Sequence, residues 1–264
     1  MTGIDQPMPA VFVSHGSPMV AIETGPYQDA LRRFGREHRP RVIVVFSAHW
    51  DSGGRIVIGS AARHALIYDF GGFPKALYEV KYDAPGDPAL AALIAATLRD
   101  AGFAPGLDDA RGLDHGVWAP LRLMYPEAVT PVVEVSLPTG MAPEALCRIG
   151  AALAPLRREG VLILGSGGIV HNLALLDWRR RDRPPEPWAE AFDSWFQSRL
   201  EARVTDELFR YADAPHAALA VPTNEHFVPV FAALGAAQEG YQVKPIFRGF
   251  EYGTISMLSF ALVP

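Results

Sequence analysis

The sequence of 264 residues contains a single cysteine, Cys147, which excludes an intrachain disulfide and a zinc site built on several thiolates. Its apolar runs all fall short of the roughly 18 residues that a transmembrane helix needs. The N-terminus has no basic segment followed by an apolar stretch, so we recognise no secretory signal and expect a cytoplasmic protein. Cys147 lies in a stretch with helical spacing and is expected to be a small buried thiol.

The chain also lacks an excess of positive charge. It has 24 basic and 29 acidic side chains, a formal net charge of −5, and no basic block or stripe. This composition argues against nucleic acid or an anionic membrane as the main partner.

Several common catalytic motifs are missing. There is no Gly-x-Ser-x-Gly sequence and no His-Glu-x-x-His sequence, which disfavours serine hydrolases and the common zinc proteases. Residues 165–168 read Gly-Ser-Gly-Gly, but they lack both the Walker ending and the Gly-x-Gly-x-x-Gly spacing. A phosphate-binding loop at 165–168 therefore remains only a minor alternative.

Strand-like and helix-like segments alternate along the sequence, which predicts an α/β protein. Apolar runs of strand length occur at Ala10–Val13, Val42–Phe46, Arg55–Ile58, Pro131–Val135, Val161–Leu164 and Tyr241–Phe247, with another near Thr254–Phe260. Helical patterns occupy Tyr27–Glu37, Asp87–Ala101, Gly116–Met124, Ala142–Arg158 and Pro187–Glu201, with shorter ones at Asp206–Tyr211 and Glu225–Leu234. We expect a single domain over residues 1–264, with a largely parallel or mixed central sheet flanked by helices.

Four histidines follow hydrophobic strands at small-residue turns, namely His15, His49, His171 and His226. In open α/β sheets, ligands bind outside the carboxyl ends of the strands. Neutral imidazole is the commonest side-chain metal ligand. Histidines brought to one crevice from distant parts of the chain therefore predict a mononuclear metal site there, with His226 in the first turn of a helix.

A fifth histidine, His115, lies between Asp114 and Gly116 just before a predicted helix. A loop histidine near a metal suits general acid–base chemistry because its ordinary pKa lies near working pH. Asp114 is a candidate to orient it. The remaining histidines, at positions 38, 64 and 216, are interpreted as solvated.

The segment 68–82 is dense in aromatic residues and contains a Gly-Gly pair. Core packing explains some of these aromatics, and a loop that covers an aromatic substrate explains the rest. Lys75 and Lys81 in this segment are available to a substrate carboxylate, although exposed lysines are usually only solvated.

These segments together resemble the extradiol ring-cleaving dioxygenase superfamily that includes protocatechuate 4,5-dioxygenase, and most closely its 4,5-DOPA dioxygenase branch. The resemblance covers nearly the whole chain in order, at residues 14–18, 47–50, 68–74, 113–118, 165–172 and 222–226. No single segment would be specific.

The resemblance implies one mononuclear divalent metal ion, Fe(II) in an active dioxygenase, held by His15, His49 and His226. His171 would either bind the metal or act beside it, and His115 with His171 would form an acid–base pair. The substrates would be dioxygen and a small catechol, opened next to its two hydroxyls to a yellow semialdehyde.

One departure keeps alternatives open. Non-haem oxygenases commonly use two histidines and one carboxylate, so Glu225 is an alternative to its neighbour His226 as a ligand. An all-histidine set also suits Zn(II), which favours a zinc-dependent hydrolase or cyclase as the second hypothesis. A binding module with purely structural histidines is the third, and the oligomeric state stays open.

Overall fold

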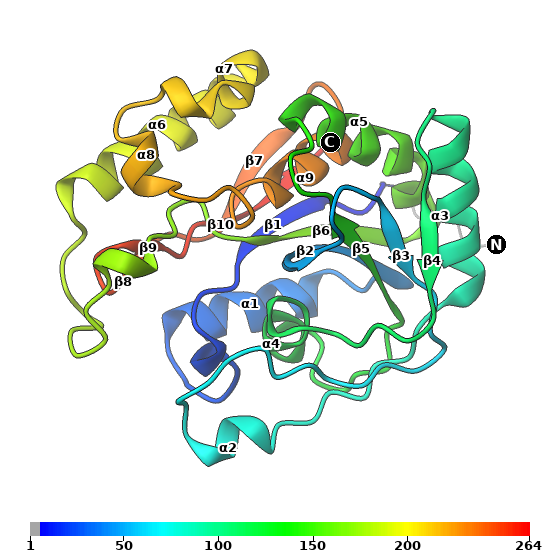
Figure 1. The fold of residues 1–264 in the computed structure, drawn as a ribbon, viewed down its shortest axis with the longest axis horizontal. Coiled ribbons are helices and arrows are strands. Elements are labelled where there is room, and N and C mark those ends of the chain that lie inside the picture. Colours follow the sequence, from blue (N-terminus) through cyan, green and yellow to red (C-terminus); the bar gives the residue numbers. More distant parts are fainter. Residues whose placement is uncertain (1–5) are drawn as a thin grey trace.

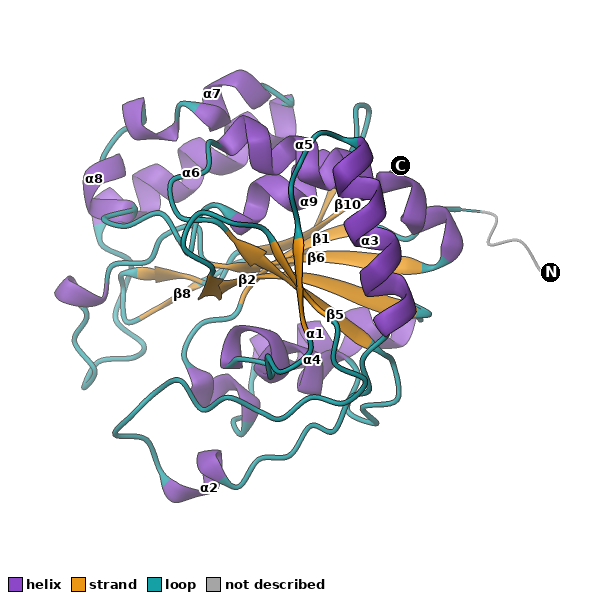
Figure 2. Cartoon of the chain, turned by 45° about the vertical axis from the view of Figure 1, so that its right-hand side comes forward, coloured by secondary structure: helices purple, strands orange, loops and turns teal. Residues whose placement is uncertain are grey.

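The computed structural model describes residues 6–264, which fold around one eight-stranded mixed sheet with helices on both faces (Figures 1 and 2). The predicted α/β class is therefore confirmed. The strands are β1 (Ala10–Ser14), β2 (Val42–Asp51), β3 (Val57–Gly59), β4 (Gly106–Asp108), β5 (Val132–Leu137), β6 (Val161–Gly167), β7 (Gln242–Phe247) and β10 (Ser259–Val263). A separate two-stranded sheet pairs β8 (Phe250–Glu251) with β9 (Ile255–Ser256).

The strand order across the main sheet is β4-β3-β5-β2-β6-β1-β10-β7. The four central strands, β5, β2, β6 and β1, are mutually parallel, whereas β3 and β10 run antiparallel to their central neighbours. Because β1, β6 and β2 are adjacent and parallel, their carboxyl ends meet at one edge, where ligands bind in such sheets.

The helices lie in two layers. Figure 2 shows α1 and α4 on one face of the sheet, with α3, α5, α6 and α9 on the other. The longer helices are α1 (Pro26–Glu37), α3 (Pro88–Asp100), α4 (His115–Met124), α5 (Pro143–Leu153), α6 (Pro187–Ala202) and α9 (Pro229–Ala237). Short helices are α2 (Lys75–Tyr78), α7 (Thr205–Phe209) and α8 (Ala217–Ala220), and four 3₁₀ segments lie at Pro18–Ala21, Ala154–Glu159, Leu173–Leu175 and Tyr211–Asp213.

Val42–Phe46 of β2 and Val161–Leu164 of β6 are apolar at every position, because both faces of these strands are covered. On β2, Val42 and Val44 enter the hydrophobic cluster beneath α3, α5 and α9, and Ile43 and Val45 enter the cluster beneath α1 and α4. All four side chains are 0–1% exposed. This two-sided burial is the reason that the strand could be predicted from sequence but its two faces could not be distinguished.

Several predicted boundaries are wrong in ways that local chemistry explains. The helix predicted over Ala142–Arg158 is two elements, because Pro155 has no N–H to continue the α-helical pattern and the chain turns 3₁₀ over Ala154–Glu159. The strand predicted near Thr254–Phe260 divides into β9 and β10. Helix α3 begins as predicted, with the Asp87 carboxylate accepting a hydrogen bond from the Leu90 N–H.

Cys147 is half-buried on α5 rather than fully buried, and burial raises the pKa of its thiol. Among residues 6–264, none of the helices combines the length and the apolar character that crossing a bilayer would need.

Candidate metal centre and substrate pocket

Strand register brings His15 and His49 to the same level of the sheet. On β1, Ser14 pairs with Gly167, and on β2, Ser47 pairs with Ser166. Continuing each parallel register places His15 and His49 on opposite sides of β6, just beyond its carboxyl end. The Nε2 atoms of the two rings are 3.1 Å apart.

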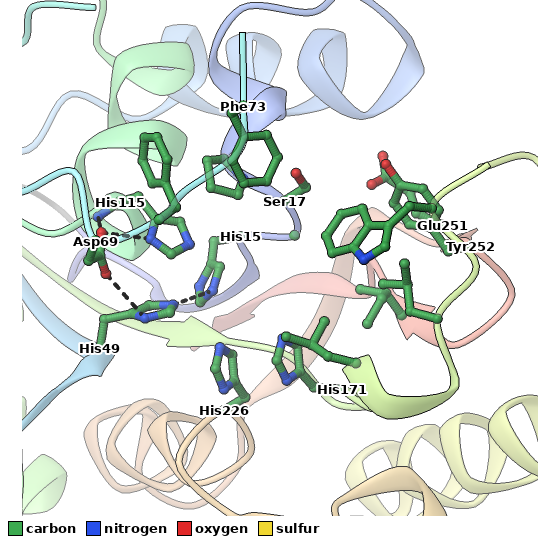
Figure 3. Close-up of a pocket in the computed structure, with 17 residues that line it drawn as sticks. His15, Ser17, His49, Asp69, Phe73, His115, His171, His226, Glu251 and Tyr252 are labelled. Carbon is green, nitrogen blue, oxygen red and sulfur yellow. Dashed lines mark hydrogen bonds and ion pairs between the residues drawn. The ribbon is translucent and has the colours of Figure 1, made fainter. Parts of the chain in front are cut away.

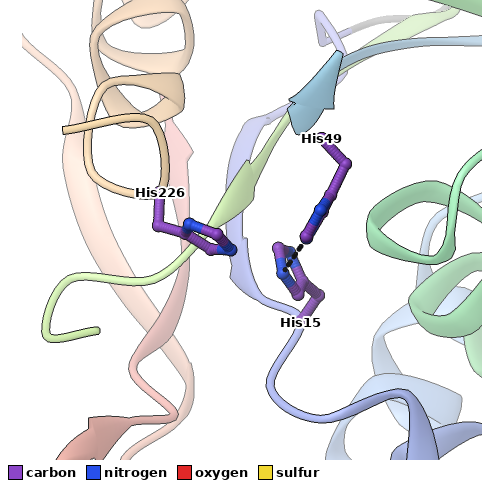
Figure 4. A group of neighbouring side chains, drawn as sticks. All are labelled: His15, His49 and His226. Carbon is purple, nitrogen blue, oxygen red and sulfur yellow. Dashed lines mark hydrogen bonds between the residues drawn. The ribbon is translucent and has the colours of Figure 1, made fainter. Parts of the chain in front are cut away.

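The other two predicted ligands, His171 and His226, come from the segments after β6 and before α9. His171 follows the bend after β6, and His226 lies in the turn before α9 (Figures 3 and 4). The helix predicted over Glu225–Leu234 starts only at Pro229, so the prediction of His226 in its first turn is wrong. The turn is nevertheless helix-like, because Val228 N–H donates to the carbonyl of Asn224.

The turn that carries His226 packs directly on β6, and glycine makes this possible. A Cβ atom on Gly167 would lie 2.0 Å from the His226 carbonyl oxygen, and one on Gly165 would lie 2.4 Å from that of Pro229. These two residues are therefore explained by close backbone packing. The minor alternative of a phosphate loop at 165–168 has no support from this geometry.

Three histidines converge on one point. Nitrogen atoms of His15, His49 and His226 all lie within 4.8 Å of one another (Figure 4). His15 is 2% exposed and His226 is 7% exposed, whereas His49 is half-buried. The three come from β1, β2 and the turn before α9, so only the folded chain assembles them.

An oxygen atom lies beside Nδ1 of each of these three rings. The Ser166 hydroxyl donates to the Gly116 carbonyl, so its oxygen accepts from His15 Nδ1–H over 3.0 Å. Asp69 Oδ2 lies 3.3 Å from His49 Nδ1, and Glu225 Oε1 lies 3.1 Å from His226 Nδ1. In a neutral imidazole, a proton on Nδ1 leaves a bare lone pair on Nε2. With this tautomer, the Nε2 atoms of the three rings would be available to bind a metal ion, as histidine ligands require.

Burial keeps His15 and His49 neutral. Burial, and then the nearby His49, lower the pKa of His15 well below its usual value. Burial, followed by the approach of His115 and His226, lowers the pKa of His49 to about 2. A metal ion needs neutral imidazole, so no deprotonation would be required at neutral pH. The donor set therefore fits a divalent cation.

Glu225 lies behind His226 rather than beside the three nitrogen atoms. Its Oε1 also accepts a hydrogen bond from Thr223 Oγ1 over 2.8 Å. The hydrogen bond from His226 lowers the pKa of Glu225 to about 2, so the carboxylate is ionised and committed to that ring. Glu225, His226 and His171 do form a further group with ligand atoms within 4.8 Å, as do His49, Asp69 and His115. In both groups the carboxylate already accepts a hydrogen bond from a histidine Nδ1–H.

His115 opens α4 and points into the same cluster. Its ring centroid is 4.1 Å from that of His49 and 5.4 Å from that of His15. Sequence reasoning placed it on a loop tip, but it is the first residue of the helix and is 6% exposed.

The residue that orients His115 is Asp69, not Asp114. Asp69 Oδ1 accepts from the His115 backbone N–H at 3.1 Å and from Nδ1 at 2.8 Å. Burial alone would raise the pKa of Asp69, but the hydrogen bond and charge of His115 lower it to about 2. Asp114 instead accepts from Ser47 Oγ and Arg111, which leaves Asp69 as a site residue that the sequence analysis missed.

His171 stacks flat against His226, with ring centroids 3.5 Å apart and planes inclined by 7°. Stacked rings direct their nitrogen lone pairs side by side rather than toward one centre. His171 is also absent from the group that His15, His49 and His226 form. Burial and the neighbouring His226 lower its pKa to about 3, so the free ring is neutral.

Other side chains interpreted from sequence lie away from this cluster. His216 is exposed, as expected, but His64 is 9% exposed and its Nε2–H donates to the Val132 carbonyl over 2.9 Å. His38 packs on Phe34 at the end of α1. Lys75 is highly exposed and pairs with Glu79, and neither Lys75 nor Lys81 lines the histidine pocket. The suggestion that these lysines meet a substrate carboxylate is therefore wrong.

The cluster forms one wall of a pocket of about 230 Å³. The segment 68–74 contributes Asp69, Phe70 and Phe73, which confirms that part of the aromatic segment covers the site. Trp178 also lines the pocket, and its ring meets that of Phe73 edge to face, with the ring centroids 6.1 Å apart. The pocket thus combines one wall of histidine nitrogen atoms with aromatic side chains on its other walls, which suits a flat aromatic ligand.

Comparison with known proteins agrees with this arrangement. A family described as the catalytic LigB subunit of aromatic ring-opening dioxygenase matches residues 9–262. The chain belongs to the LigB family of aromatic ring-opening dioxygenases. This family is metal-dependent, and the histidine–aspartate cluster could hold the metal.

Full-length relatives narrow the class further. The chain is 40% identical to the 4,5-DOPA dioxygenase extradiol of Beta vulgaris, over 94% of each chain. It is 39% identical to the protein of the same name from Escherichia coli K12, over 96% of this chain and 93% of the relative. A crystal structure of an uncharacterized Escherichia coli K12 protein superposes with a TM-score of 0.83 at 33% identity, covering 96% of this chain and 99% of that chain. The protein is an extradiol ring-cleaving dioxygenase.

Proposed function

We propose that this dioxygenase opens a small catechol, such as DOPA, at a mononuclear Fe(II) site held by His15, His49 and His226. The observation that supports this ligand set most strongly is the direction of the protons. The Nδ1 atoms of His15 and His226 hydrogen-bond to oxygen acceptors and that of His49 lies 3.3 Å from Asp69 Oδ2, so Nε2 of each ring would be left for the metal. When bound, iron would bring both catechol oxygens and dioxygen together and supply the electron transfer between them.

The protein's own residues would handle the protons. Because Asp69 takes the Nδ1–H of His115, the Nε2 atom of that ring is free to accept a phenolic proton from the bound catechol. His171 is neutral and lies across the pocket floor, beside His226. It would accept a proton during the cycle and return it to assist cleavage of the O–O bond. His171 therefore acts in this proposal as an acid–base residue, with direct metal binding as the alternative.

The aromatic walls would orient the ring and exclude water. Phe70 lies edge to face with His115 at 5.6 Å, so it approaches the position where a catechol bound over the histidines would sit. Edge-to-face and offset contacts between aromatic rings contribute about 0.5–1.5 kcal/mol each. Exclusion of water would strengthen the hydrogen bonds that hold the substrate oxygens.

Metal loading followed by an oxygen assay tests the proposal. Protein freed of metal is loaded without air with either Fe(II) or Zn(II), and oxygen uptake and yellow colour are followed with a panel of catechols. We expect uptake only in the iron sample, with the ring opened beside its hydroxyls. Absence of oxygen uptake across the panel would overturn the proposal, and activity restored by zinc without oxygen would favour a hydrolase or cyclase.

A histidine series tests the separate roles. His15→Ala, His49→Ala and His226→Ala are each expected to lose stoichiometric metal binding, whereas His115→Ala is expected to keep the metal and lose about 100-fold or more in kcat. Loss of metal in His115→Ala would contradict its assignment as an acid–base residue.

A further inference from the structure

The end of the pocket away from the histidines has a distinct chemistry. Glu251 and Tyr252 lie across the pocket from Asp69, His49 and His115 (Figure 3). A catechol held by the histidines would therefore direct the group on its side chain toward this end.

This end is an aromatic corner with one acid. Trp178 lies 5.3 Å from Tyr252 and 6.1 Å from Phe73, and both contacts are edge to face. Glu251 lines the pocket next to these three rings. Aromatic rings grouped with a carboxylate are a typical arrangement for binding an organic ammonium group, because ring faces and the acid both attract positive charge.

Glu251 has binding capacity that the protein does not use. Its side chain is only 12% exposed, and its Oε1 atom accepts from Arg181. Its Oε2 atom is buried and has no hydrogen-bond partner in the described part of the chain. A buried carboxylate that is only partly hydrogen-bonded is unfavourable, so a positive charge in the pocket that Glu251 lines would stabilise it.

Positive charge is scarce around this pocket. Of the lysine and arginine side chains in residues 6–264, none lines it. Arg181 lies nearby but is shared between Glu251 and Glu23, so the three side chains together carry a net charge of −1. A substrate carboxylate would find no free cation here, whereas a protonated amine would find an acid.

We propose that Glu251, with Phe73, Trp178 and Tyr252, binds a protonated amino group on the side chain of the catechol and so determines specificity. The inference rests on the proposed catechol-opening function. It goes further in ranking substrates by charge: aminoalkyl catechols are favoured over uncharged ones, and carboxyalkyl catechols are disfavoured. The carboxylate of an amino-acid substrate adds nothing at this site.

Three catechols with comparable side chains test the ranking in the iron-loaded protein. They are 4-(2-aminoethyl)catechol, 4-ethylcatechol and 3-(3,4-dihydroxyphenyl)propanoate. We expect kcat/KM for the amine to exceed that for the acid by about tenfold or more, the equivalent of ~1.4 kcal/mol. The amine should also be used at least as well as the corresponding amino acid. An equal or higher kcat/KM for the acid would overturn the proposal.

Variants separate direct contact from general charge. Glu251→Gln is expected to lower the ratio of amine to 4-ethylcatechol about tenfold. Glu23→Gln is the matched control, because it also removes one negative charge that pairs with Arg181, but Glu23 does not line the pocket. The ratio of amine to 4-ethylcatechol in this variant should change by less than about twofold. Equal effects of the two variants would refute contact between Glu251 and the amine.

A third variant keeps the test informative if loss of the Glu251–Arg181 pair impairs folding. Trp178 is 55% exposed, so Trp178→Leu should fold normally and lower the same ratio about threefold, the size of an exposed cation–π contact. An unchanged ratio would count against the proposal. Failure to open 4-ethylcatechol at all would instead refute the proposed function, which separates the two conclusions.

Discussion

Adding a single methyl group to β6 should weaken metal binding while the protein remains folded. Gly167→Ala would place a Cβ atom 2.0 Å from the His226 carbonyl oxygen, where real Cβ contacts stay above 3.0 Å. The turn must therefore retreat from the strand by about 1 Å, because the conflict is with backbone and not with a flexible side chain. The same carbonyl accepts the Gly168 N–H over 2.8 Å, and this hydrogen bond would stretch or break.

The expected cost follows from that displacement. A misplacement of about 1 Å at a reacting centre costs on the order of 100-fold in rate, and loss of support for a metal ligand costs about 10–100-fold in metal affinity. Global stability should fall less steeply, by about 1–3 kcal/mol, as in other overpacked sites. Gly167→Ala is thus expected to remain folded with weakened metal binding.

The neighbouring glycine provides the control. A Cβ on Gly168 would meet His171 Cβ at 3.6 Å, an ordinary contact, and its backbone is not in the left-handed region. Gly168→Ala should therefore change metal affinity and kcat/KM by only about twofold, the equivalent of ~0.5 kcal/mol. Affinity is measured by competition with a chelator and rate by oxygen uptake, with circular dichroism as a check on folding. Equal values for the two variants would refute the packing argument.

Three further outcomes follow from the hydrogen bonds and charges of the site. Asp69→Asn should weaken metal binding about 10–100-fold and lower kcat, because an amide oxygen can replace only one of the two acceptor roles; unchanged chelator competition would contradict this. Ser166→Ala removes the acceptor of His15 Nδ1–H and should lower metal affinity about tenfold with little effect on folding. The metal-free protein should lose stability as pH falls below about 6.5, because the unfolded chain takes up protons that His49 and His171, with pKa values of about 2 and 3, do not. Each such histidine contributes a slope of at most ~1.4 kcal/mol per pH unit, and urea unfolding at a series of pH values with no slope below pH 6.5 would contradict the burial argument.

The sequence predicted the central strands and the histidines better than the supports of the site. Val42–Phe46 and Val161–Leu164 are apolar throughout, so their burial on both faces could be inferred without a structure. The three-residue strand β4 and the two-residue strand β8 were missed, because such short strands are determined by tertiary pairing and carry no periodic signal.

Asp69 and Asp114 show why the supporting residues escaped prediction. Asp114 adjoins His115 in sequence and was the obvious candidate, but at the N-cap of α4 its side chain turns toward Ser47 and Arg111. Asp69 reaches both His49 and His115 only after the segment 68–74 folds over the sheet edge. Adjacency in sequence gave no guide to direction, because consecutive residues at a helix start point to different sides.

The contacts of the site also explain why the proposed catalytic and metal-binding histidines cannot be arranged independently. Ser166 on β6 accepts from His15 and donates to Gly116, so the proton on His15 depends on the position of the first turn of α4. That same turn begins with His115, whose backbone and ring both bond to Asp69. Oδ2 of Asp69 in turn lies 3.3 Å from Nδ1 of His49. One continuous chain of contacts therefore fixes the two proposed metal ligands, His15 and His49, and the proposed base relative to a single helix start. A change that moves this turn should alter metal affinity and proton transfer together, whereas a change confined to the Glu251 end of the pocket should alter only the choice of substrate.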